Sequence, residues 1–319
     1  MDARRNFRGT KLIIFGAGYV GSALAREAVE CGLSVVALTR NTEKAHALSA
    51  TGVRVVIADL ASSSWHSQIA PQAHYVVNCV SSGGGGVEGY RRSYLEGMRS
   101  ILTWARHSAW AGEGKEQDAS TDSTGIGTFV YTSSTSVYPQ SKGARVDETA
   151  PTEGAGETAQ VLVETENLVR ESRRLESSPF GRWFVLRLAG IYGPRRHHLI
   201  DQLKAKADEI SGRGDHRLNL VHRDDIVAAL WAVLGAPETV ADQVFNVADD
   251  GAVSKAEVVA WLAQRLGVAV PRFTGEPAGG RRAITPDRVI ANDKIKTMAG
   301  WKPRYPDFRS GYESVLLEA

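Results

Sequence analysis

Three glycines near the start of the chain have the spacing of a phosphate-binding turn. They follow the apolar run LIIF at residues 12–15 as Gly16, Gly18 and Gly21, and good helix formers continue from Ser22. In a strand–turn–helix unit the first glycine makes the tight turn, the second admits a pyrophosphate, and the third lets the helix pack on the strand. The N–H groups at the start of the helix carry partial positive charge, which attracts phosphates.

The order of strand, glycines and helix carries more weight than the glycines alone, because glycine makes up 32 of the 319 residues. This order predicts a dinucleotide-binding site. The residues of the turn that we expect to contact the cofactor are Gly16, Gly18, Tyr19, Val20 and Gly21.

A basic residue follows the second expected strand, at residues 33–39. Arg40 and Asn41 stand where proteins selective for NAD place an acidic residue on the ribose 2′-hydroxyl. A guanidinium suits a 2′-phosphate instead, through charge-assisted hydrogen bonds. The pattern therefore favours NADP over NAD, with Arg40 and Asn41 in contact with it. The alternative is that Arg40 is a solvated surface charge.

Two more strands are expected to end beside the cofactor. Residues 53–58 lead into Asp59 and Leu60, and residues 75–80 end at Val80 before Ser81 and a run of glycines. Ligands of open α/β sheets bind beyond the carboxyl ends of the strands. All four residues are therefore predicted cofactor contacts. The same position favours a lid over the cofactor for the SSGGGG loop, rather than a slack linker.

Strands and helices alternate along the rest of the chain. Further strands are expected at residues 128–132 and 183–188, and long helices at 90–110 and 157–175. This alternation specifies an α/β fold with a doubly wound parallel sheet, the Rossmann arrangement. Residues 111–127 lack apolar periodicity and are expected to form a disordered surface insertion.

Five motifs from residue 131 onward resemble the extended short-chain dehydrogenase/reductase family of nucleotide-sugar epimerases and dehydratases. They are YTSSTSVYP at 131–139, VLRLAGIYGPRR at 185–196, NLVHRDDIVAAL at 219–230, FNVADDGAVSKAEVVAWLAQRLG at 245–267 and AGWKPRYPDF at 299–308. The resemblance implies a cofactor-binding Rossmann domain over residues 1–185, to which 219–248 return. It also implies a smaller C-terminal α/β substrate domain over 186–319, and places Ser134 at the position of the family's catalytic Ser or Thr.

The chain departs from this family in its acid/base residues. The family's Tyr-x-x-x-Lys is absent, and Thr158 and Leu162 stand at the aligned positions. The lysine lowers a phenol pKa of ordinarily about 10, and a threonine is a poor substitute for that phenol. The pattern resembles an atypical member that keeps the cofactor site. The candidates for other catalytic groups are Ser134, Tyr94, Tyr138 and Tyr192.

Each of these candidates has a structural alternative. Any of the three tyrosines could be a packing aromatic, and Ser134 could only cap the end of its strand.

Composition narrows the classes of partner. The formal charge of +2 is too small to argue for nucleic acid, and no apolar stretch is long enough to span a bilayer. No metal is predicted, because the eight histidines and two cysteines show no ligand spacing. These features predict a cytoplasmic protein, monomeric or homodimeric, that binds a small-molecule substrate.

Motifs and composition together predict an NADP-dependent oxidoreductase or epimerase. Its substrate would be a small carbonyl or sugar-like compound, and its acid/base would be non-standard. Two non-catalytic alternatives stay open: an NADP-binding sensor or regulatory protein, and a structural partner whose nucleotide only stabilises the fold.

Overall fold

The computed structural model describes residues 9–110, 125–173, 178–205, 208–275 and 286–317. The chain divides into two compact units. Unit 1 comprises Met1–Val137, Gly156–Leu186 and Val233–Val244, and unit 2 comprises Tyr138–Ala155, Arg187–Ala232 and Phe245–Ala319. Most of the insertion predicted at 111–127 lies outside the described residues.

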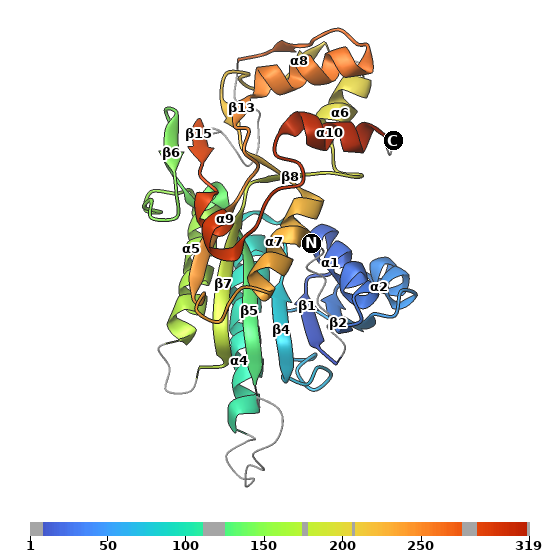
Figure 1. Cartoon of the computed structure of the whole chain (residues 1–319), viewed down its shortest axis with the longest axis vertical. Coiled ribbons are helices and arrows are strands. Elements are labelled where there is room, and N and C mark those ends of the chain that lie inside the picture. The colour runs from blue at the N-terminus through green and yellow to red at the C-terminus, as the bar shows by residue number, and fades with distance from the viewer. Residues whose placement is uncertain (1–8, 111–124, 174–177, 206–207, 276–285, 318–319) are drawn as a thin grey trace. The chain divides into compact units, whose positions relative to one another are not determined.

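A seven-stranded sheet has the order β12-β7-β5-β4-β1-β2-β3 (Figure 1). β1 pairs in parallel with β2 and β4, β2 pairs in parallel with β3, and β4 pairs in parallel with β5. The chain thus builds outward from β1 first to one side and then to the other, which confirms the predicted doubly wound sheet. The strands are β1 (Lys11–Phe15), β2 (Ser34–Thr39), β3 (Arg54–Ile57), β4 (Ala73–Asn78), β5 (Ile126–Ser134), β7 (Phe180–Leu188) and β12 (Gln243–Val247).

Helices cover β1 on both of its faces. Ile13 and Phe15 belong to a core cluster that includes Met98 of helix α4. Ile14 points the other way, toward Gly21 of helix α1, where an added Cβ would lie 3.2 Å from the Ile14 Cγ2. Side chains alternate between the faces of a strand, so a strand covered twice is apolar throughout. This explains why residues 12–15 show no polar alternation.

The long helix expected at 90–110 begins earlier and is not uniform. It opens as α3 (Gly86–Tyr90), continues as the π-helical turn η1 (Arg91–Glu96) and ends as α4 (Gly97–Trp110). The other helical segments of unit 1 are α1 (Tyr19–Glu30), α2 (Thr42–Ser49), the 3-10 turn η2 (Thr135–Val137) and α5 (Glu157–Ser172).

Unit 2 contains short strand pairs and its own apolar core. Residues 138–155, which the sequence analysis assigned to the first domain, belong to this unit. The reason is long-range pairing of β6 (Ala144–Val146) with β15 (Arg288–Ile290). The remaining pairs are β8 (Gly190–Tyr192) with β11 (Leu220–His222), β10 (Arg217–Leu218) with β13 (Val253–Ser254), and β9 (Glu209–Ile210) with β14 (Arg272–Phe273). The remaining helices are α6 (His198–Lys204), α7 (Arg223–Leu234), which runs on into unit 1, α8 (Lys255–Leu266), α9 (Asp293–Ala299) and α10 (Phe308–Leu317).

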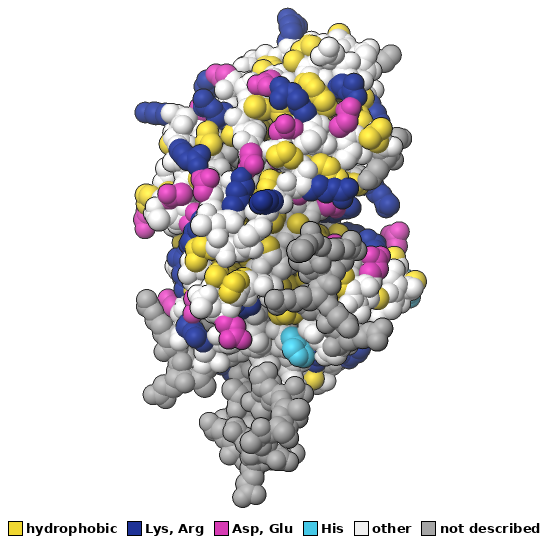
Figure 2. All heavy atoms as spheres, in the orientation of Figure 1, with side chains coloured by type: hydrophobic (Ala, Val, Ile, Leu, Met, Phe, Trp, Pro, Cys, Tyr) yellow, Lys and Arg dark blue, Asp and Glu magenta, His cyan; other side chains and the backbone are white. Residues whose placement is uncertain are grey.

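Charges of both signs are interspersed on the face seen in Figure 2, in keeping with the formal net charge of +2. Across the described ranges, no helix combines the length and the apolar character needed to cross a membrane.

Candidate functional site: a dinucleotide cradle in unit 1

Gly16 makes a turn that no other residue could make without strain. Its φ is +86°, and an added Cβ would lie 2.5 Å from the backbone N of Val80. The turn is held by the N–H groups of Gly16 and Ala17, which both donate to the Leu38 carbonyl at 3.0 and 3.1 Å. The ends of β1, β2 and β4 therefore converge at this glycine.

The surroundings of Gly18 and Gly21 exclude a side chain to different degrees. A Cβ on Gly21 would lie 2.4 Å from the Gly16 carbonyl oxygen, so helix α1 could not pack as closely with a side chain there. Among the described residues, a Cβ on Gly18 would have only that same oxygen within 4 Å, at 3.9 Å. The described part of the protein thus leaves open space beside Gly18.

The start of α1 is suited to an anion. Gly18 is its N-cap and provides no side-chain cap, and the first turn contains no acidic residue. Amide N–H groups of a first helical turn lack helical acceptors and attract negative charge. The open space beside Gly18 therefore fits a pyrophosphate. Tyr19, half-buried, and Val20, buried, are the first two residues of this helix.

Arg40 and Asn41 have different surroundings. The Arg40 side chain is exposed, and its Nη2 lies 3.3 Å from where a Cβ of Gly83 would stand. In the described part of the chain, no carboxylate forms an ion pair with it. Asn41 is the N-cap of α2, and its Oδ1 accepts the Lys44 N–H at 2.8 Å. Arg40 is thus available to a ligand, whereas the Asn41 side chain already caps a helix.

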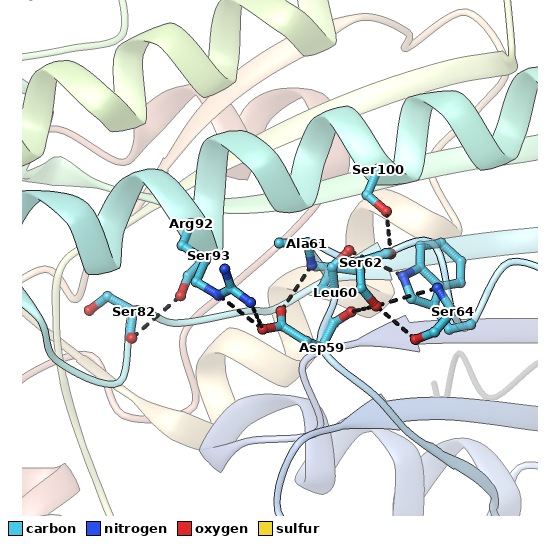
Figure 3. A network of polar contacts seen from close by, with 10 residues as sticks. Asp59, Leu60, Ala61, Ser62, Ser64, Ser82, Arg92, Ser93 and Ser100 are labelled. Atoms are coloured by element: carbon cyan, nitrogen blue, oxygen red, sulfur yellow. Dashed lines mark hydrogen bonds and ion pairs between the residues drawn. The ribbon is translucent and has the colours of Figure 1, made fainter.

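Asp59 lies after β3 at the centre of the polar network in Figure 3. Its Oδ2 accepts from Nε and Nη2 of Arg92 at 3.0 and 2.8 Å, and its Oδ1 accepts the Ala61 N–H at 3.0 Å. Burial acts to raise the pKa of Asp59, but the Ala61 N–H and the guanidinium groups of Arg92 and Arg40 outweigh it and lower this pKa. Asp59 is therefore a carboxylate. Its neighbour Leu60 is buried in the core of unit 1.

The loop after β4 supplies Val80 and Ser81. The Val80 N–H donates to Oδ1 of Asn78 at 3.2 Å, while Ser81 is exposed. Asn78 is fully buried, and its Nδ2 has no hydrogen-bond partner among the described residues. Sequence reasoning missed Asn78 and Arg92. For Arg92, no local sequence pattern gives a signal. For Asn78, the one signal is that a polar residue ends an apolar strand.

Ser134 ends β5 in unit 1 and is half-buried. Its Oγ accepts the Ser136 N–H at 3.1 Å, which is the strand-capping role weighed above. Its hydroxyl hydrogen can still be donated to another group. The preceding Ser133 donates instead to the buried carboxylate of Glu166 at 2.7 Å.

Tyr94 is the one catalytic candidate tyrosine in unit 1, and it lies in the π-helical turn η1. It is half-buried and packs on the core of unit 1, with its ring centroid 5.1 Å from that of Tyr90. π-Helical turns are rare in proteins, but those that occur are frequently located at functional sites.

Tyr138 lies in unit 2 and is 1% exposed. Its hydroxyl donates to Oδ1 of Asn246 at 2.8 Å and accepts from Nη1 of Arg187 at 2.7 Å. Burial raises the pKa of Tyr138 despite the nearby Arg187. This geometry favours the packing alternative over a role as acid.

Tyr192 also lies in unit 2 and belongs to a buried cluster. Tyr192 and His222 are register partners at the ends of β8 and β11, and the N–H of Asp249 donates to Leu220 of β11 at 2.7 Å. The side-chain atoms Tyr192 Oη, His222 Nε2 and Asp249 Oδ2 are buried without a hydrogen-bond partner among the described residues. Burial raises the pKa of Tyr192, which disfavours its use as an acid. No local sequence pattern predicts this cluster.

The positions aligned with the missing Tyr-x-x-x-Lys lie on α5. Thr158 is half-buried, and Leu162 is 2% exposed. One turn further, Glu166 is buried and pairs with Arg170 at 3.2 Å. Leu162 is thus part of the packed face of this helix.

Comparison with known proteins places the chain in a family. A model of the NAD dependent epimerase/dehydratase family matches residues 12–248, which include the glycine turn and Ser134. The chain belongs to this family. Among the described residues, no group of His, Cys, Asp and Glu side chains could hold a metal ion.

Two curated relatives are similar over part of their length. The chain is 29% identical over 182 residues to Protein YeeZ of Escherichia coli K12, covering 57% of this chain and 60% of that protein. It is 29% identical over 174 residues to the 3-diazoavenalumate denitrifying reductase of a Streptomyces species, covering 51% and 54%. The chain spans less than two thirds of the length of these relatives.

Solved structures share the fold over nearly the whole chain. MoeE5, in complex with UDP-glucose and NAD, has a TM-score of 0.79 at 20% identity, covering 96% of this chain and 97% of that one. UDP-glucuronic acid 4-epimerase from Bacillus cereus, in complex with UDP-glucuronic acid and NAD, has a TM-score of 0.77 at 18% identity, covering 97% and 100%. At such identities the similarity supports the fold alone.

Proposed function

We propose that the protein is an NADP-dependent oxidoreductase or epimerase acting on a small carbonyl or sugar-like substrate. The observation that carries this proposal is the contrast between the glycines. A Cβ would strike backbone at Gly16 and Gly21 but meets open space at Gly18. A nicotinamide cofactor, when bound, supplies hydride transfer. Arg40, exposed and without an ion-pair partner in the described ranges, supports NADP rather than NAD.

The same proposal assigns the proton-donating group to Tyr94, with Ser134 as a hydrogen-bond donor to the substrate. Tyr94 and Ser134 are half-buried and lie in the unit that contains the glycine turn. The hydroxyls of Tyr138 and Tyr192 are buried in unit 2. The similarity to a denitrifying reductase favours reduction over epimerisation.

A second candidate is a sensor that binds NADP without turnover. It is favoured by the buried Leu162 at the position where a lysine would be needed to activate a phenol. A cytoplasmic location, a substrate-binding role for unit 2 and a monomeric or homodimeric state stay predictions under either candidate.

Cofactor titration tests the nucleotide part of the proposal. Calorimetry on the wild type should show tighter binding of NADP than of NAD. A hydrogen bond to a charged group is worth about 1.5–3 kcal/mol, or roughly tenfold to a hundredfold in affinity. Arg40→Ala should erase most of that difference, whereas Arg26→Ala, at an exposed arginine of α1, should preserve it. Equal affinities in the wild type would refute the NADP preference.

Turnover separates the enzyme from the sensor. The nicotinamide absorbance should change when the NADPH-bound protein is given a library of small carbonyl compounds. Tyr94→Phe should lower the rate by about 10²–10⁴, the usual worth of general acid–base catalysis. Tyr138→Phe should leave the rate unchanged if the protein folds. Tight NADPH binding without turnover of any compound would favour the sensor.

A further inference from the structure

Arg92 extends from η1 to the end of β3, where one carboxylate holds it. Two of its nitrogens, Nε and Nη2, donate to the same oxygen of Asp59 at 3.0 and 2.8 Å (Figure 3). The side chain is nevertheless 59% exposed. Its third nitrogen, Nη1, has no hydrogen-bond partner among the described residues. The guanidinium is therefore fixed in orientation while part of its donor capacity is unused.

A second guanidinium approaches the same carboxylate. The positive charge of Arg40 contributes to the lowered pKa of Asp59, after the larger effect of Arg92. Arg40 also lies beside the glycine loop, with Nη2 at 3.3 Å from a Cβ built on Gly83. Two positive charges thus accompany one negative charge at the carboxyl edge of the sheet, which leaves a local excess of about one positive charge.

A phosphate monoester matches this arrangement better than a hydroxyl does. It carries a charge of about −1.5 to −2 near neutral pH and offers three acceptor oxygens. Guanidinium groups recognise phosphate through paired N–H donors, and two of them neutralise it more fully than one. NADP carries such a monoester at its ribose 2′ position. NAD has a hydroxyl there instead, so it gains no charge-assisted contact with these arginines.

We propose that Arg92 is a second specificity-determining residue, which binds the 2′-phosphate of NADP together with Arg40 while Asp59 holds its guanidinium in place. This inference rests on the proposed NADP-dependent function. Arg92 then discriminates NADP from NAD, and it does not contribute to the contacts that both cofactors share.

The test isolates the phosphate by comparing ligands with and without it. Binding of NADP, NAD, adenosine 2′,5′-bisphosphate and adenosine 5′-monophosphate is measured for the wild type and for Arg92→Met. The variant should weaken both 2′-phosphorylated ligands about tenfold. The affinities for NAD and the monophosphate should stay within about twofold. Arg91→Met is the matched control, because Arg91 is also on η1 and pairs with Glu164 at 3.5 Å.

The outcomes separate this inference from the proposed function. A wild type that binds both cofactors equally refutes the NADP preference and this inference with it. A wild type that prefers NADP, with Arg92→Met keeping that preference or weakening all four ligands equally, overturns the inference about Arg92 alone. If Arg92→Met does not fold, Arg92→Lys keeps the charge but loses the fork, and it should weaken the 2′-phosphorylated ligands selectively. Unchanged selectivity in Arg92→Lys would count against the inference.

Discussion

At the scale of single residues, the two later glycines of the turn differ in the space around them. The space beside Gly18 is open, whereas a Cβ on Gly21 would overlap the Gly16 carbonyl oxygen at 2.4 Å. A side chain at position 18 therefore meets little protein among the described residues, but it would block a pyrophosphate bound as we propose. At position 21 a side chain must push the helix away from the strand.

We expect Gly18→Val to abolish NADP binding in calorimetry while shifting the thermal midpoint by only a few degrees. Gly21→Val should lower the midpoint much more, because overpacking costs about 1–3 kcal/mol and occasionally more, and here the clash is with backbone. Gly267→Ala is a control for glycine substitution away from the site. Its backbone φ of +66° causes strain, but no atom of the described residues lies within 4 Å of the added Cβ. Wild-type NADP affinity in Gly18→Val would mean that the phosphates bind elsewhere.

At the scale of elements, α5 presents a packed face at the position that the sequence analysis aligned with a lysine. Leu162 is 2% exposed and is followed one turn later by the buried Glu166. A helix can carry a catalytic side chain only if that position faces the site rather than the core. Because Leu162 is buried, its apolar side chain leaves no exposed apolar patch at this position.

Restoring the dyad tests this view of α5. Leu162→Lys should lower the free energy of unfolding by a few kcal/mol, because burying an unpaired charge is costly. Gln160→Lys, at an exposed position of the same helix, should cost less than about 0.5 kcal/mol. Urea unfolding measures both. If Leu162→Lys were as stable as the control, the position would reach solvent, and Thr158→Tyr with Leu162→Lys should then be assayed for turnover.

Within unit 2, hydrogen bonds join two of the motifs that resemble the family, residues 219–230 and residues 299–308. The Asp225 carboxylate accepts the backbone N–H groups of Arg304 and Tyr305 at 2.6 and 3.1 Å, and the indole of Trp301 donates to the Asp225 carbonyl at 3.1 Å. Asp225, at the start of α7, therefore holds the segment that precedes α10. This contact gives the aspartate a structural task beyond its favourable charge at a helix N-terminus.

At the scale of the whole molecule, the buried cluster of unit 2 creates a pH dependence of stability. Burial raises the pKa of Asp249 to about 8 from 3.8 and lowers that of His222 to about 4 from 6.5. The stability due to Asp249 is fully present below about pH 3.8 and is lost as the pH rises through about 8. The stability due to His222 is present above about pH 6.5 and is lost as the pH falls through about 4. Between about pH 4 and 6.5 the two groups therefore change the free energy of unfolding in opposite directions as the pH rises.

We therefore expect the free energy of unfolding to fall by ~2 kcal/mol between about pH 6.5 and 8, where, of these two groups, Asp249 is the one protonated in the folded but not in the unfolded state. Asp249→Asn should remove this decline, because the amide resembles the neutral carboxyl in shape and cannot ionise. Urea unfolding at pH 6.5, 7.2 and 8 measures the slope. Glu238→Gln, at an exposed carboxylate, should keep the wild-type curve. An undiminished decline in Asp249→Asn would show that another group causes it.

The sequence by itself determined the features of this protein that depend on neighbouring residues. The strand, the three glycines and helix α1 are contiguous, and each has a local physical cause: an apolar run, a positive φ at Gly16, and good helix formers from Ser22 on. The alternation of such units was enough to predict the doubly wound sheet. The position of Arg40 directly after a strand was predicted by the same logic, because β2 ends at Thr39; its role toward a cofactor stays a prediction.

Only the tertiary structure determined the contacts of side chains whose partners lie far away in the sequence. Arg92 meets Asp59 across 33 positions, and the hydroxyl of Tyr138 meets Arg187 across 49 and Asn246 across 108. The pairing of β6 with β15 likewise placed residues 138–155 in unit 2. A hydrogen-bond partner is set by where the folded backbone brings each side chain, and residue type and spacing contain no signal for contacts of that range.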